Sequence, residues 1–379
     1  MTEIASRSSS PDRAVPKCPN GLFNFPLDSV IVTDPDEEIL ELYMNLASTS
    51  PEIGPHQTDS GGLGFLDSTS STLDLSLDLT PETGSGSSEA ISGKTSTDVP
   101  IGHGRRGKNK NSRKVEDKSV DSVEVRIQQD IGMLKGRGGD TGSVLWRSSL
   151  HLARLILSQH HHRPPQSPTI INPEFFKKAN ILELGAGTGL LAILLAPICA
   201  SYTASDRMEN LKLVKRNLEL NGLGAAGHTV LPDDSLHRKE KEKKAAKSNG
   251  ETRLDVRLEE IDWIAVSEET KRQHGRGQSH HAHDGEEELV YDLVLAVDCI
   301  YNEHLVRPLV DTLARYCPVG GKTVVWVVVE LRSADVLTTF LEAWTSDPSD
   351  PWTIVRLGEK GMGRWDGKRA RWVGWVAWR

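Results

Sequence analysis

The stretch ILELGAGTGLLAILLAP, from Ile181 to Pro197, decides the fold that we predict for this chain. Its first apolar residues favour a buried strand, and the run from Leu190 to Leu195 favours a helix packed on the same sheet. Between them lies a glycine turn, which lets the chain reverse sharply and lets a ligand approach the backbone closely. A strand, a glycine turn and a helix in this order are typical of a Rossmann-like nucleotide site.

The spacing of the turn narrows the class of ligand. Gly185, Gly187 and Gly189 form the pattern Gly-x-Gly-x-Gly, whereas a dinucleotide site has Gly-x-Gly-x-x-Gly. An acid, Glu183, stands two residues before the first glycine. This variant resembles the first motif of class I S-adenosylmethionine-dependent methyltransferases, whose ligand has no pyrophosphate to bind. An ordinary glycine-rich turn between a strand and a helix is the alternative.

A second acid, Asp206, ends the strand-like segment SYTASD, about twenty residues beyond the glycine turn. Rossmann-like folds hold the two ribose hydroxyls with a carboxylate at this point. A carboxylate suits this role because it only accepts hydrogen bonds and can accept two at once. Asp206 also fits a cap of the following helix, MENLKLVKRNLELNG, and the two roles are compatible.

The segments around this motif predict the fold class. Strand-like and helix-like segments alternate downstream of Asp206, as in a doubly wound α/β fold with a mostly parallel sheet. LVYDLVLAVD and KTVVWVVVELR favour buried strands, whereas HLVRPLVDTLARYC and SADVLTTFLEAW favour helices. Upstream, VDSVEVRIQQD has the periodicity of a strand and RSSLHLARLILSQ has an apolar helical face. The C-terminal segments TIVRLG and RWVGWVAWR favour two more strands.

The composition of the chain limits its partners and its compartment. A chain of 379 residues with a net charge of −8 is not expected to bind polyanions in general. Its four cysteines have neither zinc-ligand spacing nor the pattern of a disulfide framework, which favours a reducing intracellular compartment. The scattered histidines lack a regular ligand geometry, so we expect no metal. The polar N-terminus argues against a signal peptide, and no apolar run approaches the roughly 20 residues that span a bilayer.

We predict a domain boundary near residue 120. Residues 1–119 are expected to be mostly disordered, with one short helix near 34–48, and to be dispensable for cofactor binding. Within them, the basic run at 105–114 is interpreted as a solvated linker, with a nuclear signal or a contact with ribosomal RNA as the alternative. Residues 120–379 form the predicted catalytic domain, with polar insertions near 233–253 and 273–288.

A second motif, AVDCIYNEHLV, follows a strongly apolar strand segment. Asp298 and Tyr301 come just after the carboxyl end of that strand, the edge at which ligands of open α/β sheets bind. We therefore expect both residues beside the same cleft as the glycine turn. Base-modifying amino-methyltransferases have Asn/Asp-Pro-Pro-Tyr here, and this chain lacks both prolines, which favours a protein amine. Asp298 also fits a cap of the helix that follows.

The ordered set GDTGSVLW, ELGAGTG, Asp206, IDW and VDCIY resembles the seven-strand lysine methyltransferases of the methyltransferase-16 group, over roughly residues 120–379. The DCIYNEHLV and GLGFLD segments, the N-terminal helix and the tryptophan-rich end are most similar to its fungal ribosomal members. The resemblance implies a Rossmann-like seven-strand class I fold, closed by an antiparallel last strand. It also implies a protein-lysine N-methyltransferase that uses S-adenosylmethionine on a large-subunit ribosomal protein. We expect a monomer without membrane or nucleic-acid substrate, in the cytoplasm and with the nucleus as an alternative.

The resemblance further implies a cofactor site of eight residues: Trp146, Glu183, Gly185, Ala186, Gly187, Asp206, Trp263 and Val297. Trp146 would line the pocket from the N-terminal side, and the segment Gly185 to Gly187 would form its floor. Asp206 would hold the ribose, while Trp263 would contact the adenine region and Val297 the sulfonium side. Aromatic faces suit an adenine and a sulfonium cation, although both tryptophans also fit ordinary core positions.

The expected chemistry is simple, because the sulfonium carries its own leaving group and the protein mainly aligns a nucleophile with the methyl group. A lysine amine, with a solution pKa of about 10.4, must first lose its proton. We expect Asp298 to align the ammonium and accept or relay that proton, and Tyr301 to bound the substrate slot. Two other functions stay open: methyl transfer to another protein, a small molecule or RNA, and cofactor binding without catalysis.

Overall fold

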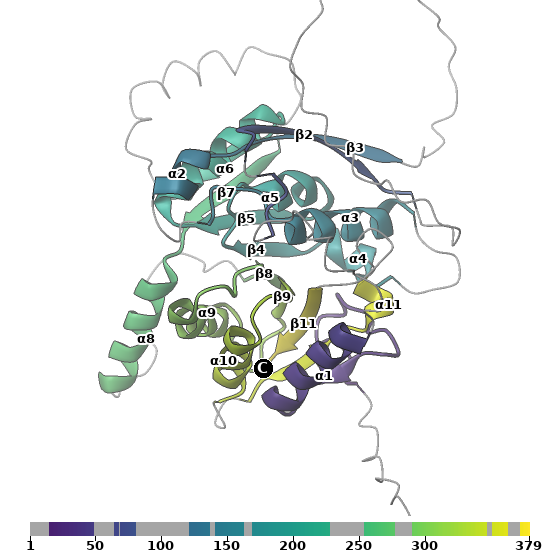
Figure 1. Ribbon diagram of the computed structural model, residues 1–379, viewed down its shortest axis with the longest axis vertical. Helices are drawn as coiled ribbons and strands as arrows, with labels where there is room; N and C mark the ends of the chain where they lie inside the picture. Colours follow the sequence, from purple (N-terminus) through teal and green to yellow (C-terminus); the bar gives the residue numbers. More distant parts are fainter. Residues whose placement is uncertain are drawn as a thin grey trace, which may run out of the picture.

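The computed structural model describes residues 15–48, 64–67, 69–80, 121–136, 141–162, 169–227, 254–276, 290–346, 351–362 and 372–379. These residues form a nine-stranded sheet with the order β1-β10-β11-β9-β8-β4-β5-β7-β6, together with a two-stranded sheet of β2 and β3. Helices cover both faces of the large sheet (Figure 1). One apolar core lies on each face, as expected for a parallel sheet flanked by crossover helices.

Six strands form the parallel part of the large sheet: β4 (Asn180–Leu184), β5 (Ser201–Asp206), β6 (Gly224–Gly227), β7 (Asp255–Glu260), β8 (Leu293–Val297) and β9 (Val324–Glu330). β4 lies between β5 and β8, so the strand order changes direction at this point. Such a switch point opens a crevice at the carboxyl ends of the strands, where ligands of doubly wound folds bind. The predicted fold class is confirmed.

The helices that pack on the large sheet divide between its two faces. One face is covered by α3 (Arg147–His161), α5 (Leu190–Leu195) and α6 (Met208–Leu220). The other is covered by α1 (Pro35–Ser48), α8 (Trp263–Arg276), α9 (Glu303–Tyr316) and α10 (Ala334–Thr345). The short helices are α2 (Ile131–Gly136), α4 (Pro173–Phe176), η1 (Ala196–Ile198) and α11 (Glu359–Met362). No helix in the described part of the chain has the length and apolarity needed to traverse a bilayer.

The C-terminal strands run against the parallel part of the sheet. β11 (Trp372–Trp378) pairs antiparallel with β9 and with β10 (Thr353–Arg356), so the predicted antiparallel last strand is confirmed. At the sheet edge, β1 (Val30–Ile31) pairs antiparallel with β10. α8 differs from the prediction, because it begins at Trp263 and takes in the start of the insertion expected at residue 273.

Residues 15–48 pack on the catalytic domain, which differs from the predicted boundary near residue 120. The helix expected near residues 34–48 is present as α1, and it lies against α10. Its buried Glu38 accepts a 2.8 Å hydrogen bond from Nε1 of Trp375 and pairs with Arg356. Phe23 packs edge-on against Trp326, with 5.1 Å between the ring centroids. These contacts make the segment part of the folded domain.

A second correction concerns the segment STLDLSLDL, which was expected to be disordered. The structure forms β2 (Thr72–Asp78) here, paired antiparallel with β3 (Ser122–Gln128). Alternate side chains of this segment are buried: Leu73, Leu75 and Leu77 in β2, and Leu79 directly after it. Leucines alternating with Asp and Ser are a strand signal, which the polar composition around them hid. The basic run at 105–114 and the insertion at 233–253 lie outside the described residues.

Candidate functional site

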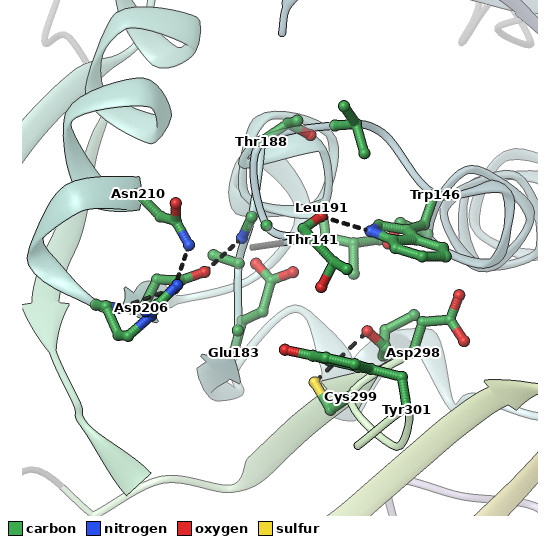
Figure 2. A pocket seen from close by; sticks show the side chains of 18 of the residues that line it. Thr141, Trp146, Glu183, Thr188, Leu191, Asp206, Asn210, Asp298, Cys299 and Tyr301 are labelled. Atoms are coloured by element: carbon green, nitrogen blue, oxygen red, sulfur yellow. Dashed lines mark hydrogen bonds between the residues drawn. The ribbon is translucent and has the colours of Figure 1, made fainter. Parts of the chain in front are cut away.

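A pocket of about 420 Å³ opens at the carboxyl ends of β4, β5 and β8, at the switch point of the sheet. Every residue of the predicted site lines it: Trp146, Glu183, Gly185, Ala186, Gly187, Asp206, Trp263, Val297, Asp298 and Tyr301. These residues come from segments far apart in the chain and converge because parallel strands end at one edge of the sheet. Figure 2 shows the inside of the pocket, with Asp206 and Trp146 on opposite walls.

The glycine turn forms the floor of the pocket and leaves no space for side chains. Gly185 has a φ of +72°, a conformation that favours glycine. A Cβ on Gly185 would lie 3.1 Å from Sγ of Cys299 and 3.3 Å from the ring of Trp263. Trp263 therefore rests against the backbone of the turn, and any larger residue at position 185 would displace it.

Asp206 connects the end of β5 to the glycine turn. Its carboxylate accepts hydrogen bonds from the backbone N–H of Gly187 (2.8 Å), from Nδ2 of Asn210 (2.8 Å) and from the backbone N–H of Arg207 (2.7 Å). Burial raises the pKa of Asp206, and the hydrogen bond from Gly187 is the largest opposing effect. A carboxylate has about four acceptor positions, and these three hydrogen bonds leave one of them available for a ligand hydroxyl. Arg207, not Asp206, is the N-cap residue of α6.

Glu183 lies at the centre of the pocket wall (Figure 2). Burial raises its pKa to about 8, although the hydrogen bond from Tyr202 lowers it. The negative charge of Asp206 acts in the same direction as burial. Glu183 is therefore mostly neutral at pH 7, and a cation bound in this pocket would favour its charged form.

Trp146 forms the opposite wall and is held on three sides. Its Nε1 donates a 2.9 Å hydrogen bond to the carbonyl oxygen of Thr141. The ring of Phe65 packs on it with 4.6 Å between centroids, and the guanidinium of Arg332 lies 4.7 Å from its ring centroid. Trp146 is half-buried and is not an ordinary core residue, because its ring also lines the pocket.

Asp298 directly follows β8 in a strained conformation. Its φ of +58° is the only positive value among the described non-glycine residues. Its side chain is 2% exposed and accepts hydrogen bonds from Ser148 Oγ (2.7 Å), the Glu330 N–H (3.3 Å), and Nη1 (2.9 Å) and Nη2 (2.6 Å) of Arg332. Asn302, not Asp298, caps α9 by accepting from the N–H of His304.

These four bonds bear on the expected proton transfer to Asp298. A carboxylate has about four acceptor positions, and all of them are occupied. A proton from a lysine would have to displace Arg332 or Ser148 before it reached an oxygen. The geometry therefore favours a fixed negative charge at Asp298 over a proton acceptor.

Tyr301 lies across the pocket with its hydroxyl directed toward Glu183 (Figure 2). Burial of the phenol raises its pKa, and a hydrogen bond with Thr141 lowers it. The phenol is therefore neutral near pH 7 and contributes a ring face and a hydroxyl. The whole residue is 39% exposed, so Tyr301 lies where the pocket meets solvent.

Sequence reasoning missed several lining residues: Thr141, Gly142, Arg207, Asn210, Ile261, Asp262, Cys299 and Asn302. Two of them carried a signal, since Gly142 lies in the GDTG turn and Asn210 follows Asp206 by four positions at the start of a helix. Arg332 contacts Asp298 without lining the pocket and had no such signal.

Residues 120–249 and 277–346 match the family described as lysine methyltransferase. Ribosomal lysine N-methyltransferase 5 of Zygosaccharomyces rouxii is 29% identical over 257 residues, which cover 64% of this chain and 76% of that protein. The protein of the same name from Candida glabrata is 25% identical over 277 residues, covering 64% of this chain and 75% of that protein.

A diaminohydroxyphosphoribosylamino-pyrimidine deaminase of Schizosaccharomyces pombe is 28% identical over 225 residues. That match covers 59% of this chain, which spans only 42% of the deaminase. The present sequence has neither H-x-E nor P-C-x-x-C, the signature of zinc-dependent base deaminases. The described residues also contain no group of three or more His, Cys, Asp or Glu side chains that could hold a metal.

Proposed function

Because the chain belongs to the lysine methyltransferase family, we propose that it methylates the side-chain amine of a lysine in a large-subunit ribosomal protein. The observation that carries the proposal is the pocket, in which the glycine turn, Asp206 and the Asp-x-x-Tyr segment 298–301 meet. Two relatives at 25% and 29% identity are named ribosomal lysine N-methyltransferase 5, which supports the choice of substrate.

The pocket residues fit S-adenosylmethionine, which supplies a methyl group on a positively charged sulfur when bound. The glycine floor admits a ligand close to the backbone, and Asp206 keeps an acceptor position for a ribose hydroxyl. Trp263 offers an aromatic face for the adenine, and Val297 lines the side proposed for the sulfonium. A cation that enters the pocket favours the deprotonated form of buried Glu183, and the attraction between the two charges then contributes to binding.

The substrate lysine would approach from the rim formed by Tyr301 and Asp298. There, two carboxylates, Asp298 and Glu330, share the single guanidinium of Arg332. The cluster keeps a net negative charge, which attracts an incoming ammonium, while the ring of Tyr301 bounds the slot. Since the acceptor positions of Asp298 are filled, we assign the lysine proton to solvent at the rim. The in-line alignment of the neutral amine then provides the rate enhancement.

Methyl transfer to nucleic acid is the second candidate, and the AVDCIY segment argues against it because both prolines of the base-modifying motif are absent. A protein substrate is consistent with the family, and within that class we propose a monomeric enzyme of the cytoplasm or nucleus.

The test is methyl transfer from tritiated S-adenosylmethionine to purified large and small ribosomal subunits. We expect one labelled protein of the large subunit, and methyl-lysine as the labelled product after acid hydrolysis. Label in RNA or in the small-molecule fraction would instead support the alternative substrates. Binding of S-adenosylhomocysteine without any labelled product would indicate a binding protein.

A further inference from the structure

We propose that Arg332 is a positioning residue of the methyl-transfer site, and that residues 64–67 form a strap that holds it. The inference rests on the proposed function and adds two elements outside the pocket lining. Arg332 follows the carboxyl end of β9, a strand in the interior of the sheet, and the strap belongs to the N-terminal segment that was expected to be dispensable.

The guanidinium of Arg332 connects three groups. Nη1 and Nη2 donate to the two oxygens of Asp298, at 2.9 and 2.6 Å, in a bidentate pair. Nη2 also donates to Oε2 of Glu330 at 2.9 Å. The same guanidinium lies 4.7 Å from the centroid of the Trp146 ring. Arg332 thus joins the turn after β8 to the opposite wall of the pocket, and its planar fork suits both contacts.

The turn that Arg332 holds determines where pocket residues lie. Asp298 has a left-handed backbone, which costs about 1–3 kcal/mol for a non-glycine residue unless its surroundings hold it. Its neighbours Val297 and Cys299 line the pocket, and so does Tyr301 at the end of the turn. Ser148, in the first turn of α3, donates to the same carboxylate. The hydrogen bonds to Asp298 therefore hold the turn, and Arg332 supplies two of the four.

The strap closes over Arg332 and needs glycine at its first position. Gly64 has a φ of +101°, and a Cβ there would collide with Nη2 of Arg332 and lie 2.8 Å from Oε2 of Glu330. The carbonyl oxygen of Gly64 accepts from the N–H of Arg147 at 3.1 Å. The ring of Phe65 packs against that of Trp146 at a tilt of 57°, so the strap contacts both Arg332 and Trp146.

The test is a double-mutant cycle on the full-length protein, read by single-turnover methyl transfer to large ribosomal subunits at saturating S-adenosylmethionine. Calorimetric titration with S-adenosylhomocysteine runs in parallel. We expect Arg332→Gln to slow transfer by at least about tenfold while affinity changes by less than about threefold, because Arg332 does not line the pocket. In an Asp298→Asn background, Arg332→Gln should cause no further loss, because Arg332 acts through Asp298.

Two further variants separate positioning from folding. Arg332→Lys keeps the charge without the fork, so part of the rate should return. The double variant leaves no unpaired charge at position 298, where Arg332→Gln alone would leave a buried carboxylate without its arginine, so it should fold better than Arg332→Gln. Arg307→Gln is the matched control, because Arg307 bonds a buried aspartate, Asp311, at 2.8 Å, and neither residue lines the pocket. That control should keep the wild-type rate.

The outcomes distinguish this inference from the proposed function. Failure of the wild-type protein to label any lysine would overturn both. Labelling by the wild type together with a normal rate for Arg332→Gln would overturn the positioning role alone. The positioning role would also be overturned if the rate losses of Arg332→Gln and Asp298→Asn multiplied in the double variant. An equal loss of rate in Arg307→Gln would overturn it too. Gly64→Ala should lower the rate of methyl transfer, as Arg332→Gln does. An unchanged rate would contradict the role proposed for the strap.

Discussion

The phenol of Tyr202 donates a 2.9 Å hydrogen bond to Oε2 of Glu183, two residues before the glycine turn. Both side chains are buried, on the adjacent strands β5 and β4. The bond favours the charged carboxylate, yet burial outweighs it and the pKa of Glu183 rises to about 8. In the absence of a bound cation, the Glu183 carboxyl therefore holds a proton near neutral pH.

This proton makes the stability of the ligand-free protein depend on pH. The pKa of Glu183 is about 8 when folded and close to its ordinary 4.5 when unfolded. The folded state binds the proton more tightly, so its stabilising effect is complete below pH 4.5 and is lost as pH rises to about 8. We expect Glu183→Gln to gain stability relative to the wild type by up to about 1.4 kcal/mol per pH unit in this window.

Urea unfolding at three pH values between 5 and 9 measures the difference. Glu219→Gln, which replaces an exposed carboxyl on α6 by the same amide, is the matched control. A pH-independent gap between Glu183→Gln and the wild type would mean that Glu183 ionises normally in the folded protein.

The role of Asp206 in cofactor binding is tested by Asp206→Ala. Loss of a charged hydrogen bond costs about 1.5–3 kcal/mol, which implies a loss of affinity of at least about tenfold. The change also frees the N–H of Gly187, which loosens the glycine turn. Calorimetric titration with S-adenosylmethionine checks the loss. Glu209→Ala removes one exposed negative charge from the first turn of α6, the helix that follows Asp206, and this control should keep the wild-type affinity. If a folded Asp206→Ala variant bound S-adenosylmethionine as tightly as the wild type, Asp206 would not contact the cofactor.

Asp298→Asn tests the charge at the rim of the pocket. The substitution keeps the shape of the side chain but removes the negative charge, so we expect a large fall in turnover with cofactor affinity nearly retained. Single-turnover transfer at saturating cofactor is the measurement. Asp311→Asn is the matched control, because Asp311 is also buried and paired with an arginine but lies outside the pocket lining. A near-normal rate for Asp298→Asn would leave Asp298 a purely structural role.

The contribution of β2 to the domain is tested by two neighbours on opposite faces of the strand. Leu75 is buried, whereas Asp74 is exposed and pairs with Arg126 at the surface. Leu75→Ala should lower the free energy of unfolding by about 2–5 kcal/mol. Asp74→Ala should lower it by less than about 1 kcal/mol. Denaturant unfolding measures both, and similar small effects would mean that β2 is dispensable, as its composition suggested.

Much of the fold and the pocket was predictable because the decisive signals are local. The glycine spacing, Glu183 and Asp206 lie within one strand–helix–strand unit, and the apolar runs at β8 and β9 are contiguous. Parallel strands end at one edge, so residues after β4, β5 and β8 had to meet. β2 was missed although its leucines alternate, because its polar surroundings suggested disorder and its partner β3 lies beyond residue 120.

The sequence therefore determined the class of fold, the position of the pocket and ten of the residues that line it. Only the tertiary structure decided which hydrogen-bond partners those residues have and how their pKa values shift. Asp298 was expected to accept or relay the lysine proton, but a residue 34 positions away, Arg332, fills half of its acceptor positions. The pKa of Glu183 likewise depends on burial by elements distant in the chain. Burial and long-range pairing are properties of the packed molecule, because charge and hydrogen-bonding partners are assigned only when separate segments come together.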